Sequence, residues 1–144
     1  MIYKYIALAV LLTIASIYDI RNDTVPNFFI VIGALAGCAM ALFSVGINIA
    51  DALMGWIVAG GVLYFVSIAT RGGIGKDDAK LAGCLGIYTG LMDALSILIL
   101  SSIICGLTGL IILAFHRSEK KRCLPFSPFL LAGTVFTILL NFLV

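Results

Sequence analysis

Three aspartates could do chemistry, because they lie at the edges of long apolar stretches. Asp19 ends an apolar run whose only charge is Lys4, and Asp77 and Asp78 open another run after three closely spaced glycines. An ionisable group in or beside a membrane span is costly and is by default a functional hypothesis. Simpler roles are open as well: Asp19 could lie among lipid headgroups, and Asp78 could cap a helix N-terminus. A carboxylate suits a helix C-terminus poorly, since that end favours cations.

Two carboxylates held close together support a defined reaction. They share one proton, because both cannot be ionised cheaply at the same site. The ionised member can take a proton from water, and the protonated member can donate to a carbonyl oxygen, as in aspartic proteases. Asp19 and Asp78 are therefore a candidate pair for peptide hydrolysis, provided that the fold brings them together.

The composition indicates which elements must position these residues. Of the 144 residues, 62% are hydrophobic and only 11% are charged, and the mean hydropathy is +1.21. Soluble domains have about 45–50% apolar and about 25% charged residues. The sequence therefore excludes a soluble enzyme, a disordered protein and a nucleic-acid binder, and it predicts an all-α, polytopic membrane protein with a single domain over 1–144.

Polar breaks divide the chain into six predicted transmembrane helices. The fourth is short and rich in glycine, and the polar break that follows it is weak, so a five-span arrangement is an alternative. The predicted spans are 2–18, 27–46, 50–70, 79–92, 94–115 and 127–144.

Basic residues predict the orientation of these spans. With six spans, eight of the nine Lys and Arg residues fall on one side of the membrane and only Lys4 on the other. The positive-inside rule makes the eight-residue side cytoplasmic, which places both termini outside and the aspartates at the cytoplasmic face. Merging the fourth and fifth spans would move the basic cluster 116–122 outside, so the asymmetry favours six. The first span carries no cleavage site and is expected to be retained.

Cysteine and histidine give no sign of a metal or cofactor site. The four cysteines form no C-x-x-C pair, and His116 is the only histidine. Neither residue type approaches a zinc-ligand spacing, and we expect no cofactor and no metal. The cluster from His116 to Arg122 is interpreted as a topology anchor that contacts anionic membrane lipid.

Three segments resemble motifs of the type IV prepilin peptidases, a family of membrane aspartyl proteases. The first runs from Asp19 through Val25-Pro26-Asn27 and is similar to the family's first-aspartate motif. The second, Gly75-Lys-Asp-Asp78-Ala-Lys80-Leu, is similar to Gly-x-Gly-Asp-x-Lys-Leu. The third, Pro-Phe-Ser-Pro-Phe at 125–129, resembles a segment that leads into the last helix. The resemblance covers essentially the whole chain.

The resemblance implies an activity and a site. Asp19 and Asp78 would be the catalytic pair, and Gly75 and Lys80 would shape the second motif. The substrates would be pilin-like precursors in the cell membrane of a prokaryote, cleaved of a short basic leader at the cytoplasmic face. No cofactor is implied. Longer members carry a cysteine-rich methylation region, and this chain resembles the form that has only the peptidase.

One departure from the family pattern lies beside the second catalytic aspartate. Asp77 replaces the motif glycine, so it could raise the proton affinity of the pair or take the catalytic role itself. The register of Ala79-Lys80-Leu81 favours Asp78.

Three residues near the first aspartate are further candidates. Pro26 and Asn27 are expected to shape the loop after the first span, with Asn27 either capping a helix or hydrogen bonding near the site. Asp23 is a candidate for binding the basic leader.

Other classes of protein are alternatives. A presenilin-like or signal-peptide-peptidase-like protease is one, although its Pro-Ala-Leu motif is absent. A catalytically inactive homologue, or a small channel or transporter lined by Asp19 and Asp78, is another. Small-residue pairs such as Gly33-x-x-x-Gly37 could pack helices within one chain or between chains, so the oligomeric state is open.

Overall fold

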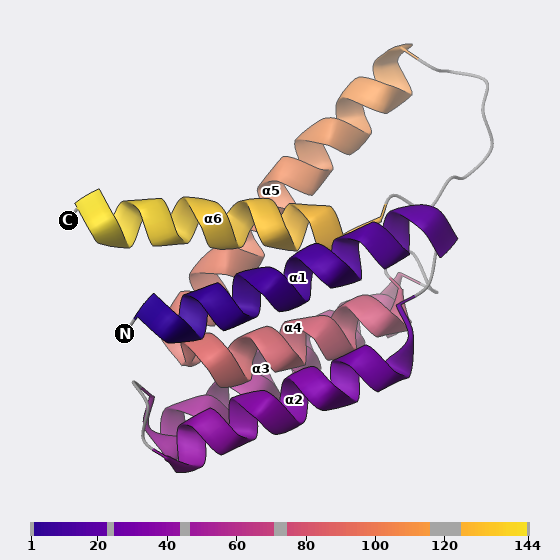
Figure 1. Cartoon of the computed structure of the whole chain (residues 1–144). Coiled ribbons are helices and arrows are strands. Elements are labelled where there is room, and N and C mark those ends of the chain that lie inside the picture. Colours follow the sequence, from indigo (N-terminus) through magenta and orange to yellow (C-terminus); the bar gives the residue numbers. More distant parts are fainter. Residues whose placement is uncertain (1, 23–24, 44–46, 71–74, 116–124, 144) are drawn as a thin grey trace.

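The computed structural model describes residues 2–22, 25–43, 47–70, 75–115 and 125–143, and all regular secondary structure in these ranges is helical. This confirms the predicted all-α class and the separation of the fourth and fifth helices. The helices are α1 (Ile2–Asn22), α2 (Asn27–Leu42), α3 (Ile49–Ala69), α4 (Lys76–Thr89), α5 (Leu91–Phe115) and α6 (Ser127–Leu143) (Figure 1).

The outer surface of the bundle is apolar, as expected for a membrane protein. Within the described ranges, α1, α3 and α5 are long and apolar enough to cross a membrane, whereas α2 and α6 are shorter apolar helices. Large apolar side chains such as Phe65, Leu110 and Phe115 point outward on these helices. An exposed apolar surface of this extent would be costly in water but suits lipid. These features confirm the prediction of a polytopic membrane protein.

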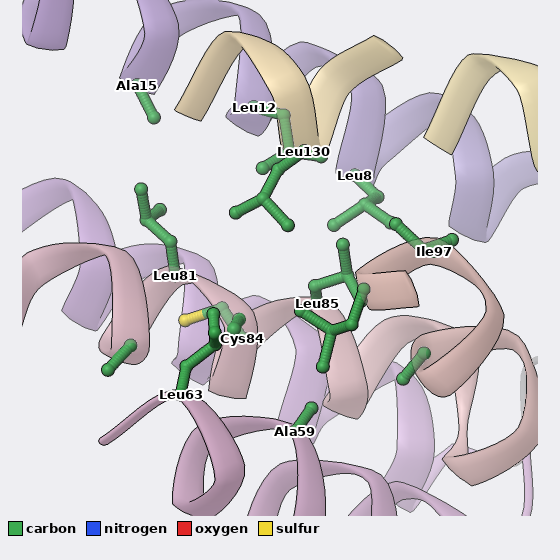
Figure 2. Packing of buried hydrophobic residues seen from close by; sticks show 14 of the residues in the cluster. Leu8, Leu12, Ala15, Ala59, Leu63, Leu81, Cys84, Leu85, Ile97 and Leu130 are labelled. Carbon is green, nitrogen blue, oxygen red and sulfur yellow. The ribbon is translucent and has the colours of Figure 1, made fainter. Parts of the chain in front are cut away.

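Helix α4 lies at the centre of the bundle. It contacts each of the other five helices, and from Asp78 to Thr89 only Lys80 is exposed. Its leucines pack between α1 and α6 on one side and α3 on the other (Figure 2). Because its neighbours shield it from lipid, α4 can be short, glycine-rich and polar in its first turn. The site residues Asp77 and Asp78 lie in that turn, before the apolar part of the helix begins at Ala79.

Glycines let α3 and α4 approach until their backbones touch. A Cβ atom on Gly86 would lie 2.2 Å from the carbonyl oxygen of Gly55, and one on Gly55 would lie 2.3 Å from that of Gly86. Small residues at such crossings allow close packing in membranes. The Gly33-x-x-x-Gly37 pair packs within the chain too: Gly33 faces Leu11 of α1, and Gly37 faces Tyr88 of α4.

A single glycine separates α4 from α5. Gly90 has a φ of 83° and a ψ of −179°, a conformation that is open to glycine and costly for other residues. The N–H of Gly90 donates a hydrogen bond to the carbonyl oxygen of Gly86, and the next helix begins at Leu91. The weak break in hydropathy at this position is therefore a sharp break in the backbone.

Several helix boundaries differ from the predicted spans: α2 ends at Leu42 rather than at 46, α4 ends at Thr89 rather than at 92, and α5 begins at Leu91 rather than at 94. Two further differences concern the site. Helix α1 continues to Asn22, so Asp19 lies inside its last turn, and α4 begins at Lys76 rather than after Asp78. Hydropathy marks the part of a helix that suits lipid, whereas the helix itself extends into polar turns.

Both chain termini lie at one end of the bundle, and the starts of α4 and α6 lie at the other, with the end of α1 (Figure 1).

We predict that Gly86→Ala destabilises the bundle by about 2 kcal/mol. The added Cβ meets backbone of α3, which no side-chain rotation can relieve. Thermal unfolding in detergent measures the change. Gly106→Ala is the matched control, because a Cβ there meets nothing within 4 Å. Equal melting temperatures for the two variants would contradict the close contact between α3 and α4.

Candidate active site

The structure buries two carboxylates at one end of the bundle. Asp19 on α1 is 8% exposed, and Asp78 on α4 is 7% exposed. Burying a charged group without partners is costly, so such groups are normally paired or hydrogen-bonded. Among the described residues, neither carboxylate forms a salt bridge. Their hydrogen bonds must therefore offset part of the cost of burial.

Ser127, the first residue of α6, contacts both aspartates. Its main-chain N–H donates to Oδ2 of Asp19 at 3.4 Å, and its hydroxyl donates to Oδ1 of Asp78 at 3.2 Å. Ser127 is itself fully buried. Both bonds are long for their donor types. Three helices thus bring Asp19, Asp78 and Ser127 to one point.

The environment of Asp78 favours its protonated form. Burial, reinforced by the nearby charge of Asp19, raises the pKa of Asp78 to about 7. The hydrogen bond from Ser127 acts in the opposite direction, because it stabilises the ionised carboxylate. Asp77 adds a smaller upward contribution to the same pKa. Near neutral pH Asp78 can therefore carry a proton.

Asp77 lies on a different side of α4 and has a different partner. It is half-buried, and its Oδ1 lies 3.1 Å from Nζ of Lys80, one helical turn on. Lys80 also donates to Oδ1 of Asn27 at 2.7 Å. Asn27 is the first residue of α2, and the helix has no side-chain cap. This polar chain ties the start of α4 to the start of α2, beside the buried pair rather than within it.

Gly75 leaves room for the carboxylate of Asp78. A Cβ atom at this position would lie 3.1 Å from Oδ2 of Asp78, closer than most real contacts allow. The carbonyl oxygen of Gly75 accepts a hydrogen bond from the N–H of Asp78, and this bond lies in the first turn of α4. The requirement here is space rather than backbone conformation, because the φ of Gly75 is −61°.

The remaining predicted site residues lie further out or outside the described part. Pro26 precedes α2 with a φ of −59°, and its carbonyl oxygen accepts the N–H of Phe29. Asp23 and the basic cluster from His116 to Arg122 fall outside the described residues. In the part of the chain that the structure describes, no three His, Cys, Asp or Glu side chains are grouped so as to hold a metal ion.

No sequence pattern singles out Ser127. A serine between two prolines is typical of a turn, and nothing in its own segment points to two aspartates far away in the chain. The separations are 108 residues to Asp19 and 49 to Asp78. Its place follows only from the packing of α6 against α1 and α4.

Comparisons with known proteins show the family of this chain. The model of the type IV leader peptidase family matches residues 6–110, which include both buried aspartates. The chain is 30% identical over 131 residues to a prepilin leader peptidase/N-methyltransferase of Bacillus subtilis (strain 168), covering 90% of this chain and 52% of that protein. It is 27% identical over 126 residues to a protein of the same description from Pseudomonas putida, covering 83% of this chain and 44% of that protein.

The chain thus spans about half the length of the curated relatives it matches. No solved structure matches it significantly. The family model covers well over half of the chain, from the first helix into the fifth. The chain belongs to the type IV leader peptidase family.

Proposed function

We propose that this protein is a membrane aspartyl endopeptidase that removes short basic leaders from pilin-like precursors. The observation that carries the proposal is the pair of buried carboxylates, Asp19 and Asp78, joined through Ser127. The relatives' printed descriptions name a prepilin leader peptidase, which supports the substrate class. The reaction needs no metal or cofactor, because two carboxylates supply both the base and the acid.

The environments of the two carboxylates support distinct roles. Asp78 holds the shared proton, because burial and its neighbour raise its pKa to about 7. Asp19 acts as the base and accepts a proton from the attacking water. The water oxygen bonds to the carbonyl carbon of the scissile amide, while Asp78 donates its proton to the carbonyl oxygen. Collapse of the tetrahedral intermediate breaks the C–N bond: Asp19 passes the proton that it took from water to the leaving nitrogen, and Asp78 regains its proton from a hydroxyl of the intermediate as the new carboxyl group forms.

The contacts around Asp77 support Asp78 as the second catalytic residue. Asp77 is held by Lys80 on the more exposed side of α4, whereas Asp78 is buried beside Ser127. We infer that Lys80 and Asn27 fix the start of α4 and that Gly75 gives the Asp78 carboxylate its space. Pro26 shapes the loop between α1 and α2, and Asp23 is a candidate contact for the basic leader.

The charge asymmetry of the sequence supports a cytoplasmic location for the site. The end of α1, which holds Asp19, and the start of α4, which holds Asp78, lie at the end of the bundle opposite the two chain termini (Figure 1). Eight of the nine basic residues are predicted on that side of the membrane. A leader in the cytoplasm would then reach the site while the apolar segment of the precursor stays in the bilayer. The membrane is the cell membrane of a prokaryote in this proposal.

Single substitutions test the catalytic pair. Asp19→Asn and Asp78→Asn should each lower leader cleavage by at least about 100-fold, since each removes a group that transfers a proton. The measurement is co-expression with a model prepilin, scored by gel shift for leader removal. Asp77→Asn is the matched control and should retain cleavage. Activity in Asp78→Asn with loss in Asp77→Asn would move the second role to Asp77, and binding without cleavage by wild type would indicate an inactive homologue.

The pH dependence tests the proton on Asp78. Because its pKa is raised to about 7, Asp78 is protonated below this pH and loses its proton above it. The value of kcat/KM should therefore fall about tenfold per pH unit above pH 7, as one essential proton is lost. Asp77→Asn removes a nearby negative charge and should move this fall in kcat/KM, the alkaline limb of the pH profile, to slightly lower pH. A rate that stays constant up to pH 9 would contradict the assignment of the acid.

A further inference from the structure

In the first turn of α6, every residue that has a main-chain N–H donates it to a defined partner. Phe129 and Leu130 both donate to the carbonyl oxygen of Phe126, at 3.0 and 3.1 Å. Pro128 has no N–H. Ser127 is therefore the one residue of this turn whose main-chain donor is left for a side chain, and it takes Asp19. A helix N-terminus also carries partial positive charge, which suits an ionised carboxylate.

The hydroxyl of Ser127 completes the arrangement. Serine hydroxyls inside helices commonly bond the carbonyl four residues back, as Ser101 does with Ile97 on α5. At the first residue of a helix no such intrahelical carbonyl exists. The Ser127 hydroxyl instead donates to Oδ1 of Asp78. One residue thus supplies two donors, its main-chain N–H and its hydroxyl, one to each aspartate.

The neighbours of Ser127 hold it in place. Prolines at 125 and 128 restrict the backbone on both sides, since the ring fixes φ and also limits the preceding residue. Phe126 is 4% exposed and Leu130 is fully buried, and both belong to the hydrophobic core, so the start of α6 is anchored there. A donor fixed in this way can set the separation of two carboxylates that come from different helices.

From this geometry we propose that Ser127 is a positioning residue for the aspartate pair. It fixes Asp19 and Asp78 relative to one another through one hydrogen bond to each, and it biases the shared proton between them. The inference rests on the proposed peptidase function. Ser127 touches the carboxylates rather than the substrate, so it acts through them.

Ser127→Ala separates positioning from packing. The variant keeps the N–H to Asp19 but loses the hydroxyl bond to Asp78, which stabilises the ionised carboxylate. We expect kcat for leader cleavage to fall about tenfold and the alkaline limb of the pH profile to move up by about one pH unit. Ser127→Thr, which keeps a hydroxyl, should restore both. Ser101→Ala is the matched control, because it removes an equally buried hydroxyl that has no carboxylate partner.

A second readout does not depend on cleavage. The infrared carbonyl band of protonated Asp78, assigned by its loss in Asp78→Asn, can be titrated in the purified protein. Its midpoint should rise in Ser127→Ala and stay at the wild-type value in Ser101→Ala. If wild type cleaves no leader, the proposed function fails, while this titration still tests Ser127.

Two outcomes would overturn the inference. One is an unchanged rate and midpoint in Ser127→Ala. The other is a loss of rate that follows a lower melting temperature, equals that of Ser101→Ala and leaves the midpoint in place, which would assign Ser127 a purely structural role.

Discussion

The hydrogen bonds of Ser127 to Asp19 and Asp78 join three helices at one end of the bundle. Two carboxylates buried near one another would repel if both were charged, and each would lose its hydration. A donor to each, together with one shared proton, makes their burial tolerable. The same arrangement gives the pair unequal members, because Asp78 has a raised pKa and Asp19 receives the N–H from the start of α6. In the proposed function, this inequality supplies the acid and the base that peptide hydrolysis needs.

The central position of α4 makes that arrangement possible. A helix that begins with two aspartates would be poorly stable against lipid, but α4 is enclosed by the other five helices. Glycine contacts with α3 fix its depth and rotation, and Gly90 ends it after 14 residues. Its rotation separates the two adjacent aspartates: Asp78 faces the core near α1 and α6, and Asp77 faces Lys80. Packing of the helix thereby distinguishes two residues that are chemically identical.

Much of the fold was predictable because membrane helices are marked by apolar length and polar breaks. The six helices are confirmed, and so is the separation at Gly90, which the charge asymmetry already favoured. The predicted spans end α1 too early and begin α4 too late, because hydropathy does not follow a helix into its polar turns. Asp19 and Asp78 could be singled out as costly charges in an apolar chain. Ser127 could not, since its role depends on contacts across 49 and 108 residues.

The central claim is that Asp19 and Asp78 occupy one site. Cysteine pairs in a background without the native cysteines test it in intact membranes, with a short bifunctional thiol reagent and mass spectrometry to identify the linked peptides. Cysteines replacing Asp19 and Asp78 should be linked within one chain in high yield. Cysteines replacing Asp19 and Asp77 should be linked less, and those replacing Asp19 and Asp93, at opposite ends of the bundle, not at all. Equal or better linking of the pair at 19 and 77, or none at 19 and 78, would contradict the account.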